Sequence, residues 1–400
     1  MLTTPTYHPG SQPQQSTNSN SPRVLIVSLS TDAWVGGQEI HSFLHYTLLQ
    51  NNGVHATMLV NPTSHLCQLL QQHGQNFYTI PPLAAWLKRI RFIYHWFVRR
   101  CIRHICSKEN IDVIHCNNRH EVKDALWVKQ KISPLVFFTR HIPEPFRVRE
   151  LRGVDGVIGV SQHIVDYLKQ ENAVHKLNIP SIAYVPPFFN AEKFTSFVPT
   201  QTRQEFFEQQ FGITIDKQTP LLCTIANFYA NTLHHKNHPL LLQALHIVIV
   251  QHHKPVHALL AGNIDAAGRA FFSHMAQELG ITPYIHFLGF TEQTPAILHY
   301  SDMMVLPSRH EGFGICYMEA GLSKRPAIGA RGTGAEMTIK HEETGLLFKN
   351  NDAEDLAAAI ERLLDDPTFA QHLGQNAYEH IMKNFSPQVG ITRYLELYRI

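Results

Sequence analysis

The chain has 400 residues and a net charge of +2, with 44% apolar and 16% charged residues. This length exceeds what one ordinary hydrophobic core organises, so two domains are expected, and the composition is that of a globular protein. The near-neutral charge gives no general case for nucleic-acid binding. The sequence also lacks the apolar run of about 18 residues that predicts a membrane span.

The six cysteines are scattered and include no C-x-x-C pair. This pattern favours reduced thiols in a cytoplasmic protein over a disulfide framework or a zinc site. Residues 1–21 are rich in Ser, Thr, Asn, Gln and Pro. Such a composition is typical of a disordered tail, and it lacks the apolar core of a secretory signal.

Short β-branched strands alternate with helical patterns from Arg23 onwards. The first strand, VLIVSLS, is followed by Gly36 and Gly37 and then by a helical stretch. Ser161 is the expected N-cap of a helix over 162–170. The other strands expected in this half are His55–Val60, Asp112–His115, Leu135–Phe138, Gly156–Val160 and Ile182–Val185.

The alternation lapses into Thr, Gln and Pro and one short amphipathic stretch between 197 and 218, where we place an interdomain linker. It resumes with helices, one of them capped by Asp352, and with strands expected at Leu221–Ala226, Val256–Ala261, Ile285–Leu288, Met303–Leu306, Pro326–Gly329 and Gly345–Phe348. The predicted fold class is α/β, with two doubly wound Rossmann-like domains that face a central cleft. Ligands of such sheets bind at the carboxyl ends of the strands.

The stretch from Glu311 to Glu319 follows the strand MMVLP and gives the strongest chemical signal. Gly312 and Gly314 allow a sharp turn and a close backbone approach, and a helix is expected over Ile315–Leu322. The free N–H groups and the dipole at the start of that helix suit a diphosphate. Glu311 precedes the turn and Glu319 lies inside the expected helix, so the two serve different parts of a ligand. Carboxylates accept hydrogen bonds from paired sugar or ribose hydroxyls.

On the residues alone, a second interpretation stays open, in which the glutamates lie on the surface and the glycines serve only the turn. The run E-G-F-G-x4-E-A-G, with P-S before it and K-R-P-x-I-G after it, resembles the E-x7-E signature of family 4 glycosyltransferases of GT-B fold. Other pieces between residues 22 and 385 resemble the same family in order: Val35–Glu39, Thr139–His141, Val160–Gln162, Pro186–Phe194, Lys236–His238, Phe287–Gly289 and Thr344–Phe348.

This resemblance implies roles for the residues around the turn. Glu319 would bind the nucleotide ribose, and Glu311 would bind the donor sugar. Gly312, Phe313 and Gly314 would present backbone amides to the donor. The donor is a substrate, and the resemblance implies no cofactor and no metal.

Four residues outside the turn match the family as well. Lys236 would meet the diphosphate as a point charge, with a solvated lysine at a helix start as the alternative. Gly36 and Gly37 would let the first loop close on donor and acceptor, although a Gly-Gly pair also suits an ordinary turn. His141 would hydrogen-bond the transferred sugar or polarise the reaction, with a purely structural histidine as the alternative.

The chain departs from the family pattern at the phosphate site. The family commonly has an arginine a few residues before the phosphate lysine, where this chain has Ala226-Asn227-Phe228. Asn227 can donate a hydrogen bond but brings no charge. Either another cation, such as Arg309, substitutes for the arginine, or the phosphate is held less strongly.

Two further patterns leave alternatives open. His41 and His45 have a spacing that can bind metal on a helix, but without a third ligand nearby a packed helix face is the better interpretation. The segment Trp86–Lys108 holds seven cations and no acid, interleaved with aromatic residues. It suits either an anionic membrane surface or a helix with its aromatic residues in the core and its cations in water.

The resemblance implies an acceptor domain over 22–196, a donor domain over 219–386 and a last helix, 387–400, that returns to the first domain. It implies metal-independent transfer of a hexose-type sugar from a UDP- or GDP-sugar to a lipid-linked or polysaccharide acceptor, with retention of configuration, in cell-envelope glycan biosynthesis. The expected location is cytoplasmic, and a peripheral position at the inner face of the membrane is left open. The alternatives are a nucleotide-sugar-binding protein without efficient transfer, a sugar-nucleotide epimerase and a phosphorylase.

Overall fold

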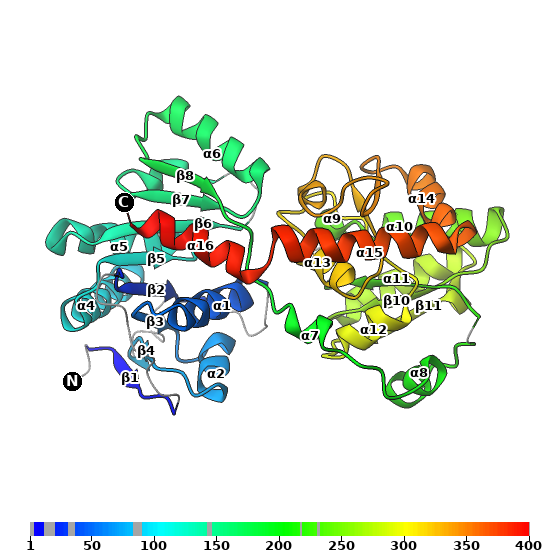
Figure 1. Cartoon of the computed structure of the whole chain (residues 1–400), viewed down its shortest axis with the longest axis horizontal. Helices are drawn as coiled ribbons and strands as arrows, with labels where there is room; N and C mark the ends of the chain where they lie inside the picture. Colours follow the sequence, from blue (N-terminus) through cyan, green and yellow to red (C-terminus); the bar gives the residue numbers. More distant parts are fainter. Residues whose placement is uncertain are drawn as a thin grey trace. The chain divides into compact units, whose positions relative to one another are not determined.

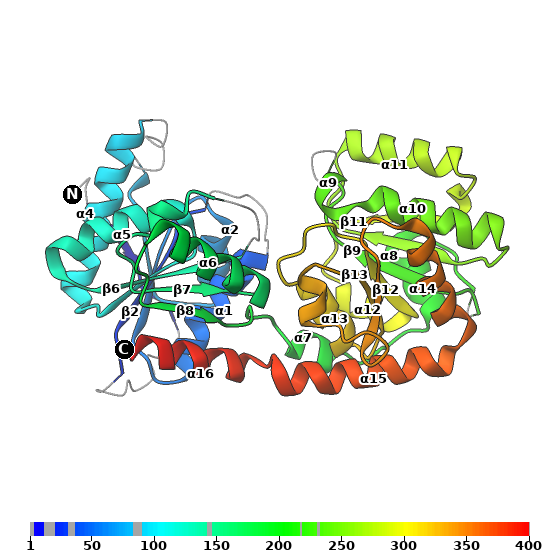
Figure 2. The ribbon, with the colours of Figure 1, turned by 90° about the horizontal axis from the view of Figure 1, so that it is seen from above.

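The computed structural model describes residues 4–11, 21–30, 37–82, 90–141, 146–216, 218–229 and 233–399. The chain forms two compact units, one of Met1–Phe189 with Pro387–Ile400 and one of Asn190–Ser386. Each unit consists of a sheet with helices packed against it (Figures 1 and 2). None of the described helices is long and apolar enough to cross a membrane.

The first unit is built on a sheet with the strand order β1-β4-β3-β2-β5-β6-β7-β8. All described neighbours are parallel except β1 and β4. Every residue of β2 and β3 is buried, because helices cover both faces of a parallel sheet. The strands are β1 (Thr6–His8), β2 (Val24–Ser28), β3 (Ala56–Val60), β4 (Phe77–Thr79), β5 (Val113–Cys116), β6 (Leu135–Arg140), β7 (Gly156–Gly159) and β8 (Ser181–Tyr184).

The helices of the first unit include the last helix of the chain, α16, which lies beside α1 (Figure 1). Tyr394 and Tyr398 of α16 belong to the same core as Val24 of β2. Ser161 caps α6 as predicted, since its side chain accepts from the Ile164 N–H. The helices are α1 (Gly37–Asn51), α2 (His65–Gln72), α4 (Arg91–Glu109), α5 (Arg119–Ile132), α6 (Gln162–His175) and α16 (Pro387–Tyr398).

The second unit has a sheet of order β11-β10-β9-β12-β13-β14, and all its described neighbours are parallel. Its strands are β9 (Leu221–Ile225), β10 (His257–Ala261), β11 (Ile285–Gly289), β12 (Met303–Leu306), β13 (Ala327–Ala330) and β14 (Gly345–Phe348). Its helices include α7 (Glu192–Thr195), α8 (Arg203–Phe211), α9 (Leu233–Lys236), α10 (His238–His246), α11 (Ala266–Glu278), α12 (Thr294–Tyr300), α13 (Ile315–Leu322), α14 (Ala353–Asp365) and α15 (Pro367–Asn384). Helix α13 lies against α15 (Figure 2). The predicted α/β class with two Rossmann-like sheets is confirmed.

Two segments differ from their predicted structure. Residues 6–8 of the expected tail form β1, which pairs antiparallel with β4, while residues 1–3 and 12–20 lie outside the described residues. The predicted linker, 197–218, contains α8, and the two units divide between Phe189 and Asn190 instead. The polar residues that suggested a linker include Thr202 and Glu205, which form a capping box at the start of α8.

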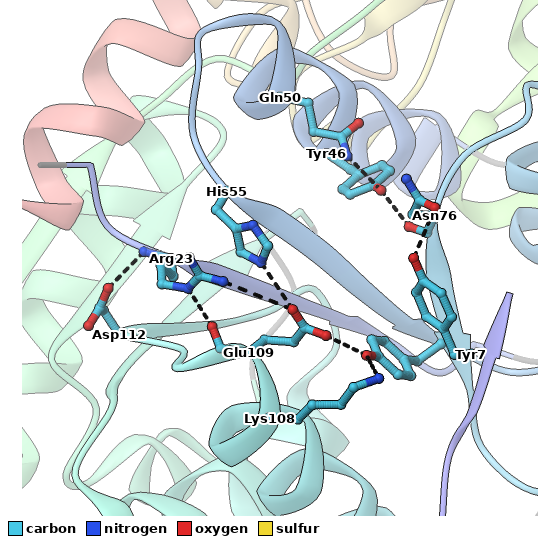
Figure 3. A network of polar contacts seen from close by, with 10 residues as sticks. Tyr7, Arg23, Tyr46, Gln50, His55, Asn76, Lys108, Glu109 and Asp112 are labelled. Atoms are coloured by element: carbon cyan, nitrogen blue, oxygen red, sulfur yellow. Dashed lines mark hydrogen bonds and ion pairs between the residues drawn. The ribbon is translucent and has the colours of Figure 1, made fainter. Parts of the chain in front are cut away.

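Polar contacts fasten β1 and the amino ends of the central strands (Figure 3). The Tyr7 hydroxyl donates to Asn76 Oδ1 at 3.0 Å, which ties β1 to the segment before β4. The Arg23 N–H donates to Asp112 Oδ2 at 2.8 Å, and the Arg23 guanidinium lies 4.0 Å from the Glu109 carboxylate. The contacts of Arg23 lie at the starts of β2 and β5, away from the carboxyl ends where such sheets bind ligands.

Candidate functional site

The turn between β12 and α13 ends in a glycine that no other residue replaces without strain. Gly314 is the N-cap of α13 and has φ of +80°, and a Cβ there would lie 2.3 Å from the Tyr317 ring. Helix α13 therefore begins at Ile315, as predicted. The Phe313 side chain is buried and packs edge-on against Phe385, with ring centroids 5.5 Å apart, so only its backbone is available to a ligand.

A second glycine loop, after β13, packs against this turn. The Gly334 N–H donates to the Glu311 carbonyl at 2.8 Å, and a Cβ on Gly334 would lie 2.4 Å from the carbonyl carbon of Gly312. The Tyr317 hydroxyl donates to the Leu306 carbonyl at 2.9 Å and ties α13 to the end of β12. Gly334 was not among the predicted site residues, although a G-T-G run one residue after a strand is a usable signal for such a loop.

Lys236 and Glu311 meet although they are 75 positions apart, with Lys236 Nζ 2.8 Å from Glu311 Oε2. Their loops are joined by the Arg309 N–H, which donates to the His235 carbonyl at 2.9 Å. Burial opposes the charge on Lys236, but the Glu311 carboxylate raises the pKa of the ammonium above its ordinary value. The structure thus brings a cation that stays charged to the loop before the N-terminus of α13. A cation and a helix N-terminus both favour an anion.

The two candidates for the missing phosphate arginine have different surroundings. Asn227 Oδ1 accepts from the Asn263 N–H at 3.2 Å, so its side chain holds the turn after β10. Arg309 lies two residues before Glu311, and its Nη2 donates to Asn351 Oδ1 at 2.6 Å. Of the two, Arg309 is therefore the side chain that brings positive charge to the loop of the Lys236–Glu311 pair.

Buried polar atoms without a hydrogen-bond partner among the described residues gather around this pair. They include Asn237 Nδ2, His238 Nδ1, Ser308 Oγ and Arg309 Nε. Because buried polar groups are nearly always paired, these atoms are available to a ligand or to ordered water.

Glu319 lies inside α13, and the charge of a cation outside the predicted site residues acts on it. Burial raises the pKa of Glu319 to about 7, and the positive charge of Lys193 on α7 opposes this rise. Lys193 belongs to the segment that resembles the family ahead of the linker, but the motif gives no sign that its charge acts on Glu319. The Glu319 carboxylate therefore changes charge near neutral pH.

The remaining predicted residues lie in the first unit. Gly36 falls outside the described residues, and Gly37 is the first residue of α1. His141 directly follows β6, and its buried Nε2 has no partner among the described residues. Burial, together with the charge of Arg140, lowers the pKa of His141 to about 4. His141 is therefore neutral at pH 7 and can both donate and accept a hydrogen bond.

His41 and His45 are completely buried on α1, and both contact the rings of α16. This is the packed helix face that was predicted in preference to a metal site. In the part of the chain that the structure describes, no group of three or more His, Cys, Asp or Glu side chains is arranged to hold a metal ion.

A groove of about 860 Å³ lies along α4 and α5 in the first unit. Phe92 and Trp96 are 77% and 47% exposed, so they do not belong to the core, whereas Phe97 is buried. The guanidinium of Arg100 lies 4.9 Å from the centre of the Trp96 ring. The groove is lined mainly by Phe92, Trp96, Trp127, Arg99, Arg100 and Arg103 and by no carboxylate, while Trp86, Lys88 and Arg89 lie outside the described residues.

Two family models match the chain in succession. The model described as Glycosyltransferase Family 4 matches residues 35–192, and the model described as Glycosyl transferases group 1 matches residues 207–380. The chain is 30% identical over 193 residues to the D-inositol 3-phosphate glycosyltransferase of Corynebacterium kroppenstedtii, covering 46% of this chain and 42% of that protein. It is 28% identical over 133 residues to the lipopolysaccharide core biosynthesis glycosyltransferase LpsE of Rhizobium meliloti, covering 33% of this chain and 39% of that protein.

The match to the first of these relatives spans less than half of its length, and the match to its homologue in Corynebacterium urealyticum spans 60%. Solved structures cover nearly the whole chain. HepE of Anabaena, solved in complex with UDP and glucose, has a TM-score of 0.74 at 18% identity, covering 95% of this chain and 100% of that one. A glycosyltransferase from Rickettsia africae has a TM-score of 0.79 at 18% identity, covering 95% and 98%. With two family models in the expected order and the fold of GT-B proteins, the chain belongs to the family 4, group 1 glycosyltransferases.

Proposed function

We propose that the protein transfers a hexose-type sugar from a UDP- or GDP-sugar to a lipid-linked or polysaccharide acceptor, with retention of configuration, in cell-envelope glycan biosynthesis. The observation that carries this proposal is the Lys236–Glu311 pair before the N-terminus of α13. The donor class is supported by the UDP and glucose bound to HepE. The acceptor class is supported by relatives named for inositol-phosphate and lipopolysaccharide core glycosylation.

In this proposal the donor diphosphate takes the position where the helix dipole and the ammonium of Lys236 both favour an anion. A diphosphate offers more negative charge than one carboxylate, so Lys236 turns from Glu311 to the donor. Glu311 is then free to accept a hydrogen bond from the transferred sugar, while Glu319 accepts from the ribose. Arg309 supplies a second positive charge in place of the family's arginine.

The transfer forms a bond between an acceptor oxygen and the anomeric carbon and breaks the bond between that carbon and the donor phosphate. The acceptor proton goes to the departing phosphate on the same face of the sugar, so no protein nucleophile takes part. Lys236 stabilises the charge that develops on the leaving group. His141 hydrogen-bonds the sugar in its neutral form. The proposal includes no metal and no cofactor.

Nucleotide release from a panel of UDP- and GDP-sugars, measured with and without acceptor glycans, tests this function. We expect acceptor-dependent release that falls about 100-fold or more in Lys236→Met, the size of effect seen when one group that stabilises a developing charge is lost. Lys383→Met removes an exposed lysine of the same unit and should leave the rate unchanged. Donor binding without release would favour a binding protein, and interconversion of free sugar nucleotides without glycoside would favour an epimerase.

We also propose that the groove along α4 rests on an anionic membrane surface, which would make the protein peripheral to a membrane. Phe92 and Trp96 point outward beside Arg100 and Arg103, which are also exposed. Aromatic side chains insert at the level of the lipid headgroups, and each nearby cation contributes about 1 kcal/mol of attraction to anionic lipid.

Cosedimentation with vesicles of phosphatidylserine and phosphatidylcholine tests this contact. Arg100→Gln with Arg103→Gln should weaken binding about 30-fold, since two charges correspond to about 2 kcal/mol. The charge-matched control, Lys169→Gln with Lys383→Gln, changes exposed lysines elsewhere and should bind as the parent protein does. Equal losses in both variants would leave only general charge attraction and overturn the assignment to α4.

A further inference from the structure

A cluster of buried histidines and tyrosines in the first unit joins three elements that are far apart in the sequence. His41 and His45 come from α1, His115 comes from β5, and Tyr394 and Tyr398 come from α16. The three histidines and Tyr394 have no exposed surface, and Tyr398 is 3% exposed. Because buried polar atoms need partners, the hydrogen bonds inside this cluster determine where its protons lie.

A backbone amide fixes the direction of the first hydrogen bonds. The Phe188 N–H can only donate, and it donates to His41 Nδ1 at 3.0 Å, so neutral His41 carries its proton on Nε2. That N–H donates to the Tyr394 hydroxyl at 3.2 Å. The Tyr394 hydroxyl lies 3.1 Å from Thr139 Oγ1, and we assign its single proton to this bond because its other partner, His41, already donates to it. Thr139 in turn donates to His115 Nε2 at 2.8 Å.

The same logic continues beyond His115. With Nε2 accepting from Thr139, the proton of His115 lies on Nδ1 and is donated to the Tyr398 hydroxyl at 2.8 Å. Tyr398 donates to His45 Nε2 at 3.2 Å. His45 therefore carries its proton on Nδ1, which is buried without a partner among the described residues. The Phe188 amide sets the tautomer of His41 alone. The direction of the relay onward to His115 and His45 is our assignment, because a hydroxyl oxygen can accept two hydrogen bonds and the pairs beyond His41 can donate either way.

The start of this relay lies against His141. The His41 ring is held at both nitrogens and stacks on Phe188, with centroids 5.1 Å apart at 17°. The His141 ring meets His41 at 4.8 Å and 73°. A ring fixed at two points cannot rotate, so it gives His141 a rigid wall to pack against. Among the residues that the structure describes, which exclude 142–145, the charged and titratable groups that act on His141 or are acted on by it are Arg140, His41, His45 and His115.

We infer that Tyr394, on the last helix, is a positioning residue for His141 and acts through His41. This inference rests on the proposed role of His141 in sugar transfer. Removing the Tyr394 hydroxyl takes away the acceptor of the His41 Nε2–H, so the His41 ring loses one of its two fixed points. Removing the Tyr398 hydroxyl breaks the relay beyond His115 and leaves both fixed points of His41 intact.

Nitrogen-15 NMR of the histidine side chains tests the relay in the unmodified protein without any activity measurement. At neutral pH we expect the Nε2–H tautomer for His41 and the Nδ1–H tautomer for His45 and His115. Finding His41 protonated on Nδ1 would overturn the inference whether or not the protein transfers sugar. In Tyr394→Phe the His141 signals should shift, and in Tyr398→Phe they should stay in place while those of His45 move.

Kinetics of the two variants tests the consequence for transfer. Tyr394→Phe should lower kcat about 10- to 100-fold with little change in the KM of the donor, the size of effect expected when a reacting group is misplaced by a fraction of an ångström to one ångström. Tyr398→Phe removes a similarly buried hydroxyl from the same helix and should keep the parent kcat. Equal losses in both variants would show a merely structural role for α16 and overturn the inference. If the parent protein transfers no sugar, the NMR shifts decide alone.

Discussion

Acidification from pH 7 to pH 5 should destabilise the first unit through its buried histidines. Burial and the nearby His141 lower the pKa of His115 to about 3, and burial with Arg140 lowers that of His141 to about 4. In the unfolded chain both titrate near pH 6.5, so the unfolded state binds more protons below that pH. Above about pH 6.5 both histidines are neutral in the folded and the unfolded state, so they cost no stability. As the pH falls below that value, keeping them neutral in the folded state lowers the free energy of unfolding. At about 1.4 kcal/mol per pH unit, each histidine costs about 2 kcal/mol by pH 5.

Glu121, also in the first unit, acts in the opposite direction. Burial raises its pKa to about 7 although Leu29 and Asn118 donate hydrogen bonds to it. A raised carboxyl pKa adds stability as the pH falls from 7 towards the unfolded value, about 2 kcal/mol by pH 5. His115 and His141 together therefore exceed Glu121 by about 2 kcal/mol. The pKa values of His41 and His45 are also lowered by burial, which enlarges the net loss.

Tryptophan fluorescence in urea measures this loss in the first unit alone, because all four tryptophans lie between residues 34 and 127. The free energy of unfolding at pH 5 should be lower than at pH 7. His115→Gln should reduce this difference by about 2 kcal/mol, since it removes one titrating group. His163→Gln, which changes an exposed histidine of the same unit, is the control. Equal stability at both pH values, or equal effects of the two substitutions, would refute the reasoning.

Three further predictions concern the second unit. Glu319→Ala should weaken donor binding, whereas Glu311→Ala should mainly lower turnover; steady-state kinetics separates the two, and unchanged kinetics in both would remove the basis of the site assignment. Because burial raises the pKa of Glu319 to about 7, donor affinity measured by calorimetry should rise between about pH 6 and pH 8, and Glu319→Gln should flatten this dependence. Gly314→Ala should destabilise the second unit by about 1–3 kcal/mol in scanning calorimetry, because φ is +80° and the new Cβ meets Tyr317. Gly280→Ala, at φ +69° in open space, should cost less, and equal losses would contradict the clash.

The sequence predicted those strands best that consist of an unbroken apolar run closed by a turn. β12, β14 and α13 have the predicted bounds. β4, by contrast, is only three residues long, and β1 lies in a polar segment. β1 pairs because Tyr7 reaches Asn76, 69 positions away, and a periodic pattern cannot show such a contact. The boundary between the units was missed for a related reason, since a capping box at Thr202 has the composition of a loop.

Family motifs named the residues of the candidate site but not their contacts. Lys236 and Glu311 each stand in a matching motif, yet their ion pair depends on the Arg309 N–H, which joins one loop to the other. Gly334 was missed because its importance comes from the backbone of Gly312, which leaves no room for a side chain. Such close approaches between loops are determined by the packing of the whole unit, and the G-T-G run signals a loop without showing which backbone it meets.

The histidine pair on α1 shows how distant groups decide between two interpretations of one local pattern. A metal ion would need a lone pair on a nitrogen of each ring. The Nδ1 lone pair of His41 already accepts from Phe188, 147 positions away, and His45 Nε2 is hydrogen-bonded to the Tyr398 hydroxyl, 353 positions away. The spacing of His41 and His45 is therefore compatible with both a metal site and a packed core, and donors from other parts of the chain make it a core. A metal could coordinate both of these nitrogens only after the Phe188 N–H and the Tyr398 hydroxyl had moved away from them.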